Sequence, residues 1–91
     1  MKETSKAVVT VIGKDMVGIL AKVSTSCANA NANVIEVTQS VLDSFFCMVM
    51  IIDITEASLP IDELQKSIAD TVPAMQVHVM HENIFNSMHR I

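Results

Sequence analysis

Residues 6–23 read KAVVTVIGKDMVGILAKV, and this stretch decides the fold. Its first part, 6–12, is rich in β-branched residues, and apolar residues occur at both its odd-numbered and its even-numbered positions. This pattern is typical of a strand that is covered on both faces. A loop bounded by glycines follows, and Asp15 in this loop is a natural N-cap. Apolar residues then recur at helical spacing. The stretch therefore predicts a strand at 6–12, a loop, and a helix at about 16–30.

The next two segments are predicted to form a β-hairpin. Apolar and polar residues alternate along 34–42, and Ile35 belongs to the set of alternate positions that is more apolar. This alternation indicates a strand at the sheet edge, with one face more exposed to water than the other. Asp43 and Ser44 form a tight turn. Residues 45–54 are apolar on both parities until near their end, which favours a central strand.

A second helix and a fourth strand complete the pattern. The helix at 60–72 starts with a proline and is stopped by Pro73. A strand at 75–81 follows, and Asn83 is expected to cap a short tail helix at about 83–89. The predicted apolar stripes of the two longer helices are Leu20, Val23, Cys27 and Ala30, and Ile61, Leu64, Ile68 and Val72.

The order of these elements predicts an α+β fold. Both β-α-β crossovers must be right-handed, which places the two helices on the same face of the sheet. We therefore expect a ferredoxin-like βαββαβ domain over 1–91, with an antiparallel four-stranded sheet and a short C-terminal helix. The first and third strands are central in this arrangement.

One face of the predicted sheet has no cover from this chain. Every strand sends one parity of side chains to that face, and apolar residues are among them: Val8 or Val9, Cys47, Val49 and Ile51. Exposed apolar patches of this kind are typical of interfaces. The sequence therefore predicts a homodimer.

The composition argues against some classes of partner and some cellular locations. The net charge of -4 argues against nucleic acid, which needs clustered cations to neutralise its phosphates. The longest apolar run, 45–52, is far shorter than the roughly 20 residues of a membrane helix. Residues 2–6 are polar, where a signal peptide would place its apolar segment. We expect a cytoplasmic protein with no membrane partner.

Three functional classes that use this element order fit poorly. An RNA-recognition module stacks bases on aromatic residues of its central strands, and the first strand here has none. A metal carrier needs a soft ligand pair, whereas His78 and His81 would point to opposite faces of a strand. A hydrolase needs an activated nucleophile. Cys27 and Cys47 both lie at apolar positions of their elements, which lack the polar, cationic setting that would activate a thiolate. We expect no catalytic residues, no metal and no cofactor.

A small-molecule sensor needs less than an enzyme does. The start of a helix offers free backbone amides and a partial positive charge, which suit a carboxylate. Gly18 lets a ligand or a partner backbone approach closely, although packing alone also explains a glycine there. Asp15 can cap the helix or receive an ammonium group.

Three stretches carry a resemblance to a known family. Residues 8–23 (VVTVIGKDMVGILAKV) and 33–37 (NVIEV) resemble the corresponding segments of the ACT domain family. The tail at 82–91 (ENIFNSMHRI) is similar to that of stand-alone ACT proteins of bacteria and archaea. The resemblance covers essentially the whole chain.

The resemblance implies a non-catalytic regulatory domain that binds an amino acid or related metabolite, usually between two copies, and a regulated protein is a further expected partner. Many members have Arg-Pro where this chain has Met16 and Val17, so the usual charged group is absent and the ligand is left open. The alternative is an adaptor dimer that binds another protein through the open sheet face or the tail at 84–91. The ligand-binding residues carried over are Asp15, Met16, Val17, Gly18, Ile19, Asn33, Val34 and Ile35.

Overall fold

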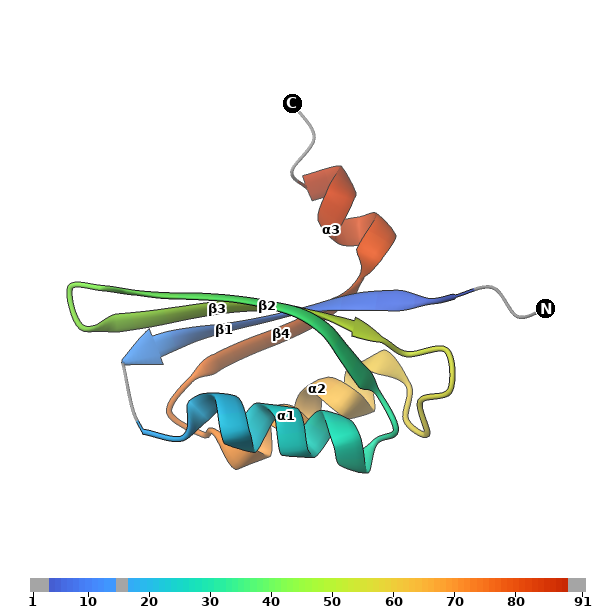
Figure 1. Cartoon of the computed structure of the whole chain (residues 1–91), viewed down its shortest axis with the longest axis horizontal. Coiled ribbons are helices and arrows are strands. Elements are labelled where there is room, and N and C mark those ends of the chain that lie inside the picture. Colours follow the sequence, from blue (N-terminus) through green and yellow to red (C-terminus); the bar gives the residue numbers. More distant parts are fainter. Residues whose placement is uncertain (1–3, 15–16, 89–91) are drawn as a thin grey trace.

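The computed structural model describes residues 4–14 and 17–88, apart from the side chains of residues 87 and 88. It has the predicted element order, with a short helix after the last strand (Figure 1). The elements are β1 (Lys6–Lys14), α1 (Ile19–Asn29), β2 (Asn33–Leu42), β3 (Phe45–Asp53), α2 (Ile61–Thr71), β4 (Gln76–His81) and α3 (Glu82–Met88).

The sheet is four-stranded and antiparallel, with strand order β2-β3-β1-β4. The predicted ferredoxin-like fold is therefore confirmed, and β1 and β3 are the central strands. Helices α1 and α2 lie together on one face (Figure 1). Helix α3 rises from the end of β4 on the opposite side of the sheet. We call that side the open face.

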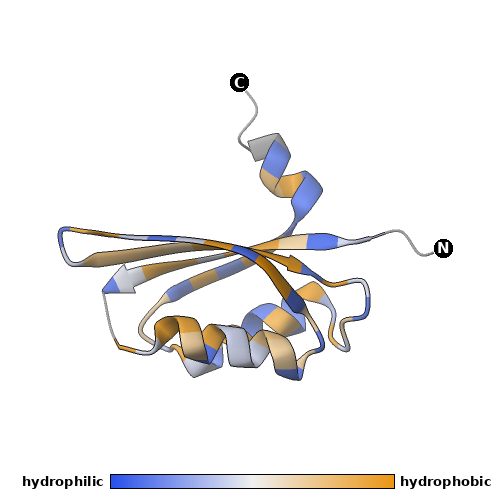
Figure 2. Cartoon of the chain, in the orientation of Figure 1, coloured by the Kyte–Doolittle hydropathy of each residue, from blue (hydrophilic) through white to orange (hydrophobic). Residues whose placement is uncertain are grey.

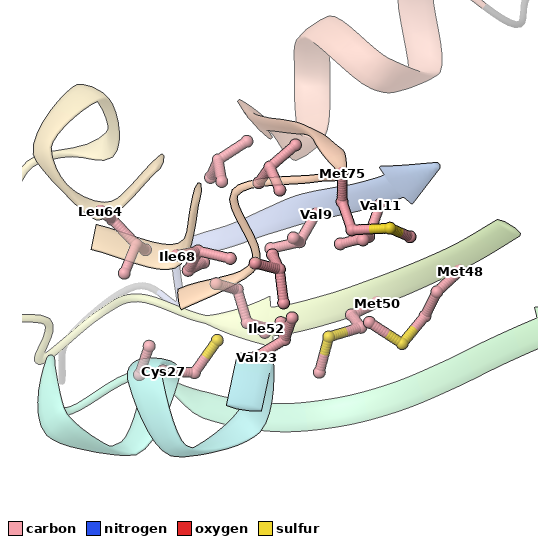
Figure 3. Close-up of a cluster of buried hydrophobic side chains, with 14 of the residues drawn as sticks. Val9, Val11, Val23, Cys27, Met48, Met50, Ile52, Leu64, Ile68 and Met75 are labelled. Atoms are coloured by element: carbon pink, nitrogen blue, oxygen red, sulfur yellow. The ribbon is translucent and has the colours of Figure 1, made fainter. Parts of the chain in front are cut away.

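The core lies between the sheet and the two long helices. Alternate residues of β1 and β3, including Val9 and Met50, point toward the helices and are fully buried. Leu64 and Ile68 of α2 close the layer from the other side (Figure 3). Val23 also belongs to this cluster. The core thus positions β1 against both helices and fixes the direction in which the β1–α1 loop leaves the sheet.

Helix α1 begins later than predicted. Its N-cap is Gly18, with φ of 84°, and no side chain within 4–14 and 17–88 makes a capping hydrogen bond there. The first helical bond runs from the Lys22 amide to the Gly18 carbonyl oxygen, 3.0 Å long. The prediction that Asp15 caps the helix is wrong, because a cap must come from the residue that starts the first turn. Asp15 itself lies outside the described residues.

The buried stripe of α1 is rotated from the predicted one. Val23, Cys27 and Ala30 are buried as predicted, but Leu20 is 38% exposed and Ile19 takes its place. Ile19 lies one helical turn before Val23, on the same side. In α2, Leu64, Ile68 and Val72 are buried, and Ile61 packs against the core while partly exposed.

The alternation of β2 is interrupted near its start. The register skips between Val34 and Glu36, so Ile35 lies in a β-bulge. Val34 and Val37 therefore pack toward the core, and Ile35 is 47% exposed. The prediction that Ile35 and Val37 share a face is wrong, because a bulge inserts one unpaired residue and reverses the parity beyond it. The edge position of β2 is confirmed.

Three turn residues have left-handed backbones. Asp43 and Ser44 have φ of 50° and 68°, which gives the hairpin a primed turn whose twist matches the strands. Asn31 ends the α1 segment with φ of 59°. Its side-chain amide donates a 2.9 Å hydrogen bond to the Glu56 carbonyl oxygen.

Helix α3 follows β4 without a loop. It begins at Glu82, so Asn83 lies inside the first turn and the prediction that Asn83 is the cap is wrong. The helix carries both hydrophilic and hydrophobic residues (Figure 2). Ile84 is 55% exposed and Phe85 is partly buried. The side chains of Met88 and Ile91 lie outside the described residues.

Gly13 lies in close packing at the end of β1. A Cβ atom added there would lie 2.7 Å from the Met75 sulfur and 3.3 Å from the Ala74 carbonyl oxygen. We expect Gly13→Ala to lower the free energy of unfolding by about 1–3 kcal/mol, because Met75 is buried and must shift. Urea unfolding measures this loss, with Lys14→Ala as the exposed neighbouring control. A Gly13→Ala protein as stable as the control would contradict the packing.

Candidate functional site

The β1–α1 loop presents the start of α1 to open space. Val17 is 97% exposed, and no heavy atom of the described residues lies within 4 Å of a Cβ built at Gly18. The backbone of Gly18, at φ of 84°, is one that a glycine adopts without strain. Among the residues that the structure describes, no side chain caps the first amides of α1, and such amides can receive an anionic group.

A small cavity and a shallow cleft adjoin this loop. The cavity, about 60 Å³, is lined by Val17, Ile19, Lys22, Thr71, Val72, Pro73 and Ala74. The cleft, about 360 Å³, lies between α1 and α2 and is lined by Ala21, Lys22, Thr25, Ser26, Asn29, Ser67 and Thr71. Lys22 and Thr71 line both. The hydroxyls of Ser26 and Ser67 are 3.1 Å apart, so this buried polar pair is satisfied within the protein.

Lys22 is a site residue that the sequence analysis missed. It places a cationic side chain beside the uncapped helix end, where it adds to the partial charge of the helix dipole. The sequence spacing could have identified Lys22. It follows Gly18 by one helical turn, so it lies over the same end of α1. Of the predicted loop residues, Val17, Gly18 and Ile19 lie together here, whereas Asp15 and Met16 lie outside the described residues.

The second group of predicted site residues lies at the other end of the sheet. Asn33 at the start of β2 pairs with Asp53 of β3, whereas the loop leaves from Lys14, which pairs with Phe45. Phe45 and Asp53 are the two ends of one strand, about 27 Å apart at roughly 3.4 Å per residue. One copy of the chain therefore does not bring Asn33, Val34 and Ile35 to the loop.

Asp53 adds an acidic group beside Asn33 that the sequence analysis did not assign to the site. Hydrogen bonds from the Thr55 side chain and backbone amide hold the pKa of Asp53 below its ordinary value. The amide bond is 2.9 Å long, and the charge of Lys6 acts in the same direction. Among the described residues, the end near Gly18 thus carries the Lys22 cation, and the end near Asn33 carries the Asp53 carboxylate with Lys6 beside it.

The open face is apolar over much of its area. Partly or fully exposed residues that β1, β3 and β4 send to it include Ile12, Phe45, Cys47, Val49, Ile51 and Met80. Val8 points to the same face but is only 2% exposed, in the region where α3 packs on β1 and β4. The sequence analysis correctly predicted Cys47, Val49 and Ile51 on this face and left Val8 and Val9 as alternatives, of which Val8 lies there and Val9 is in the core.

The two cysteines differ in reactivity. Cys27 is buried, as predicted, but Cys47 is exposed on the open face, because its parity on β3 points away from the helices. Burial raises the pKa of Cys27 from 9.0 to about 11, which lowers its thiolate fraction about 100-fold. At dilutions at which the chain is monomeric and the open face is uncovered, we expect a thiol reagent at pH 8 to modify Cys47 well before Cys27, with both reacting in denaturant. Peptide mapping checks the order, and equal native rates would contradict it.

The described residues hold no group of three metal-ligating side chains. His78 and His81 have opposite parities on β4, as predicted, because their partners on β1 are Thr10 and Ala7. Within 4–14 and 17–88, no helix is long and apolar enough to cross a membrane.

Comparisons with known proteins give the family. The ACT domain family matches residues 5–81. A UPF0237 protein of Listeria monocytogenes is 42% identical over 94% of this chain and 99% of its own length. A UPF0237 protein of the archaeon Methanocaldococcus jannaschii is also 42% identical, over 96% and 99%.

Solved structures agree with this assignment. An ACT domain protein from Streptococcus pneumoniae superposes with a TM-score of 0.76 at 28% identity, over 96% of this chain and 100% of that one. A formyltetrahydrofolate deformylase from Pseudomonas syringae has the same fold over 28% of its length, with a TM-score of 0.77 at 19% identity over 89% of this chain. The chain therefore belongs to the ACT domain family of small regulatory domains.

Proposed function

We propose that this chain is a non-catalytic regulatory protein of the cytoplasm, which binds an amino acid or a related metabolite as a homodimer. ACT domains generally bind small-molecule regulators, and the β1–α1 loop offers the matching chemistry. The observation that carries the proposal is the start of α1, where no described side chain caps the amides and no described heavy atom lies within 4 Å of a Cβ built at Gly18, beside Lys22. A ligand carboxylate fits the amides of Val17 to Ile19.

A second copy supplies the remaining part of the proposed site. Asn33 and the loop lie at opposite ends of one sheet, so they meet only if two copies reverse their strand directions. In that arrangement, Asn33 of the partner holds a polar group of the ligand beside the loop. The acidic Asp53 next to Asn33 suits an ammonium group, which supports an amino-acid-like ligand.

The mechanism of regulation is linkage between ligand and assembly. A ligand at an interface favours the assembled state only by its difference in affinity between the two states. At a ligand concentration 100-fold above Kd, the stabilisation is about 2.7 kcal/mol. For a domain of this size, that corresponds to a rise in Tm of about 10–20 °C.

A thermal-shift screen with amino acids and common metabolites tests the proposal. We expect at least one compound to raise Tm, and we expect Gly18→Asn to abolish the shift. Asparagine tolerates the left-handed backbone of Gly18 but fills the open space beside it. Lys22→Met should weaken the response, and Lys66→Met on α2 is the matched control. The loop site is wrong if no compound shifts the melt, or if Gly18→Asn responds as the unaltered chain does.

A further inference from the structure

The small cavity beside the β1–α1 loop has an apolar wall formed by the turn between α2 and β4. Val72, Pro73 and Ala74 belong to this wall, and Ile19 at the start of α1 also lines the cavity (Figure 1). Ile19 and Val72 are only 3% and 5% exposed. Val17 is 97% exposed, so it lies where the cavity meets solvent. The cavity therefore opens beside the loop and ends against buried aliphatic side chains.

The turn that forms this wall is held by a hydrogen bond and by close packing. The Met75 amide donates a 2.9 Å hydrogen bond to the Val72 carbonyl oxygen, which closes the turn. The Ala74 carbonyl oxygen and the Met75 sulfur pack so closely on Gly13 that a Cβ atom there would lie 3.3 and 2.7 Å from them. A ligand group larger than the cavity would have to displace this packed turn, which costs free energy.

The cavity has room for a small aliphatic group. Its volume is about 60 Å³. A protein cavity of about 150 Å³ holds a benzene ring, which corresponds to roughly 25 Å³ for each carbon atom. On this scale the cavity takes two or three carbon atoms, and an aromatic ring does not fit.

The wall offers few hydrogen-bond donors to a polar group. The Thr71 hydroxyl donates a 2.7 Å hydrogen bond to the Ile68 carbonyl oxygen. The Val72 amide donates a 3.2 Å hydrogen bond to the Ala69 carbonyl oxygen. Pro73 has no amide hydrogen. A polar group that enters the cavity therefore loses water without gaining a donor from these three residues, which is unfavourable.

Given the proposed function, on which this inference rests, we propose that the cavity receives the side chain of an amino-acid ligand and selects aliphatic side chains of the size of valine. Val72 sets the upper limit of that size. In the proposed site, the ligand carboxylate lies at the amides of Val17 to Ile19. Val17, Ile19 and Lys22 also line the cavity, so a side chain of two or three carbon atoms reaches it from there.

Calorimetric titration of the unaltered chain with valine, leucine, threonine and phenylalanine tests this selectivity. We expect valine to bind most tightly. Leucine is one carbon larger and should bind about 10-fold more weakly. Threonine replaces a methyl group of valine by a hydroxyl and should bind about 10- to 100-fold more weakly. Phenylalanine should show no binding at concentrations at which valine saturates the site, because its ring does not fit.

Val72→Ala is expected to reverse the order of valine and leucine. The loss of two methyl groups adds room for about two carbon atoms, which admits leucine but still leaves too little space for an aromatic ring. Val79→Ala is the matched control, because Val79 is 6% exposed and lies outside the cavity lining. It should also lose stability, but it should still prefer valine to leucine.

Phenylalanine that binds as tightly as valine would overturn the selectivity and leave the proposed function standing, because an amino acid still binds. A folded Val72→Ala protein that still prefers valine would do the same. If another metabolite raises Tm and none of the four amino acids binds, the cavity does not hold an aliphatic side chain. If no compound binds at all, the selectivity and the proposed function both fail. The ranking in the unaltered chain decides the outcome even if Val72→Ala does not fold.

Discussion

Val49→Glu is expected to convert the dimer to monomers, with Kd rising about 150- to 4,000-fold. Val49 lies near the middle of the open face, paired with Thr10 and Thr38, and it is only partly exposed even in one copy. A carboxylate there is buried without a partner when the faces stack, which costs about 3–5 kcal/mol. The two-fold axis brings both glutamates into one interface. Sedimentation velocity over a dilution series measures the change in Kd.

Val41→Glu is the matched control for this variant. Val41 pairs with Phe46, so it has the opposite parity, and it is 55% exposed on the helix side of the sheet. We expect its Kd to match that of the unaltered chain. If Val49→Glu remains as dimeric as Val41→Glu, the open face is not the interface.

Leu64→Ala is expected to lower the free energy of unfolding by about 2–5 kcal/mol. Leu64 is fully buried between α2 and the sheet, and truncation leaves a cavity that the surrounding side chains fill only in part (Figure 3). A chain of 91 residues has a total stability of about 5–14 kcal/mol, so this loss is a large share of it. Urea unfolding at one fixed protein concentration measures the loss, because dimerisation makes stability depend on concentration.

Leu20→Ala is the control for the core variant. Leu20 has the same chemistry but is 38% exposed on α1, so its truncation removes less buried surface and leaves no closed cavity. We expect a loss below about 1.5 kcal/mol. Equal losses for the two leucines would mean that the core is not centred between the sheet and α2.

The element order could be predicted because local signals agreed with the global fold. Pro60 and Pro73 bracket α2, and the Asp43–Ser44 turn joins two β-branched runs. The uncovered sheet face followed from strand parity once both helices were assigned to one side. Periodicity reports such features directly, because burial repeats every two residues in a strand and every 3.6 in a helix.

The errors arose where a single residue shifts the repeat of buried and exposed positions along an element. Asp15 looked like a cap because polar side chains usually serve there, but the left-handed Gly18 starts the helix three residues later. The bulge at Ile35 reversed the parity of β2, and no local residue signals its position. Leu20 then fell outside the stripe because the helix phase is set by packing against the sheet.

The site was harder to predict than the fold. The loop around Gly18 was selected by the chemistry of a helix start and by family resemblance, and the start of β2 at Asn33 by family resemblance alone. Neither argument carries a distance between the two. The strand register places them at opposite ends of one sheet, so the pair can act together only across two copies. Lys22 was missed because a single lysine on an amphipathic helix usually faces solvent.

Sedimentation equilibrium of the unaltered chain tests the central claim most directly. The uncovered apolar face predicts a dimer, with a mass close to twice the 9.9 kDa of one chain at low micromolar concentration. A well-folded species that sediments as 9.9 kDa across the whole concentration range would contradict it.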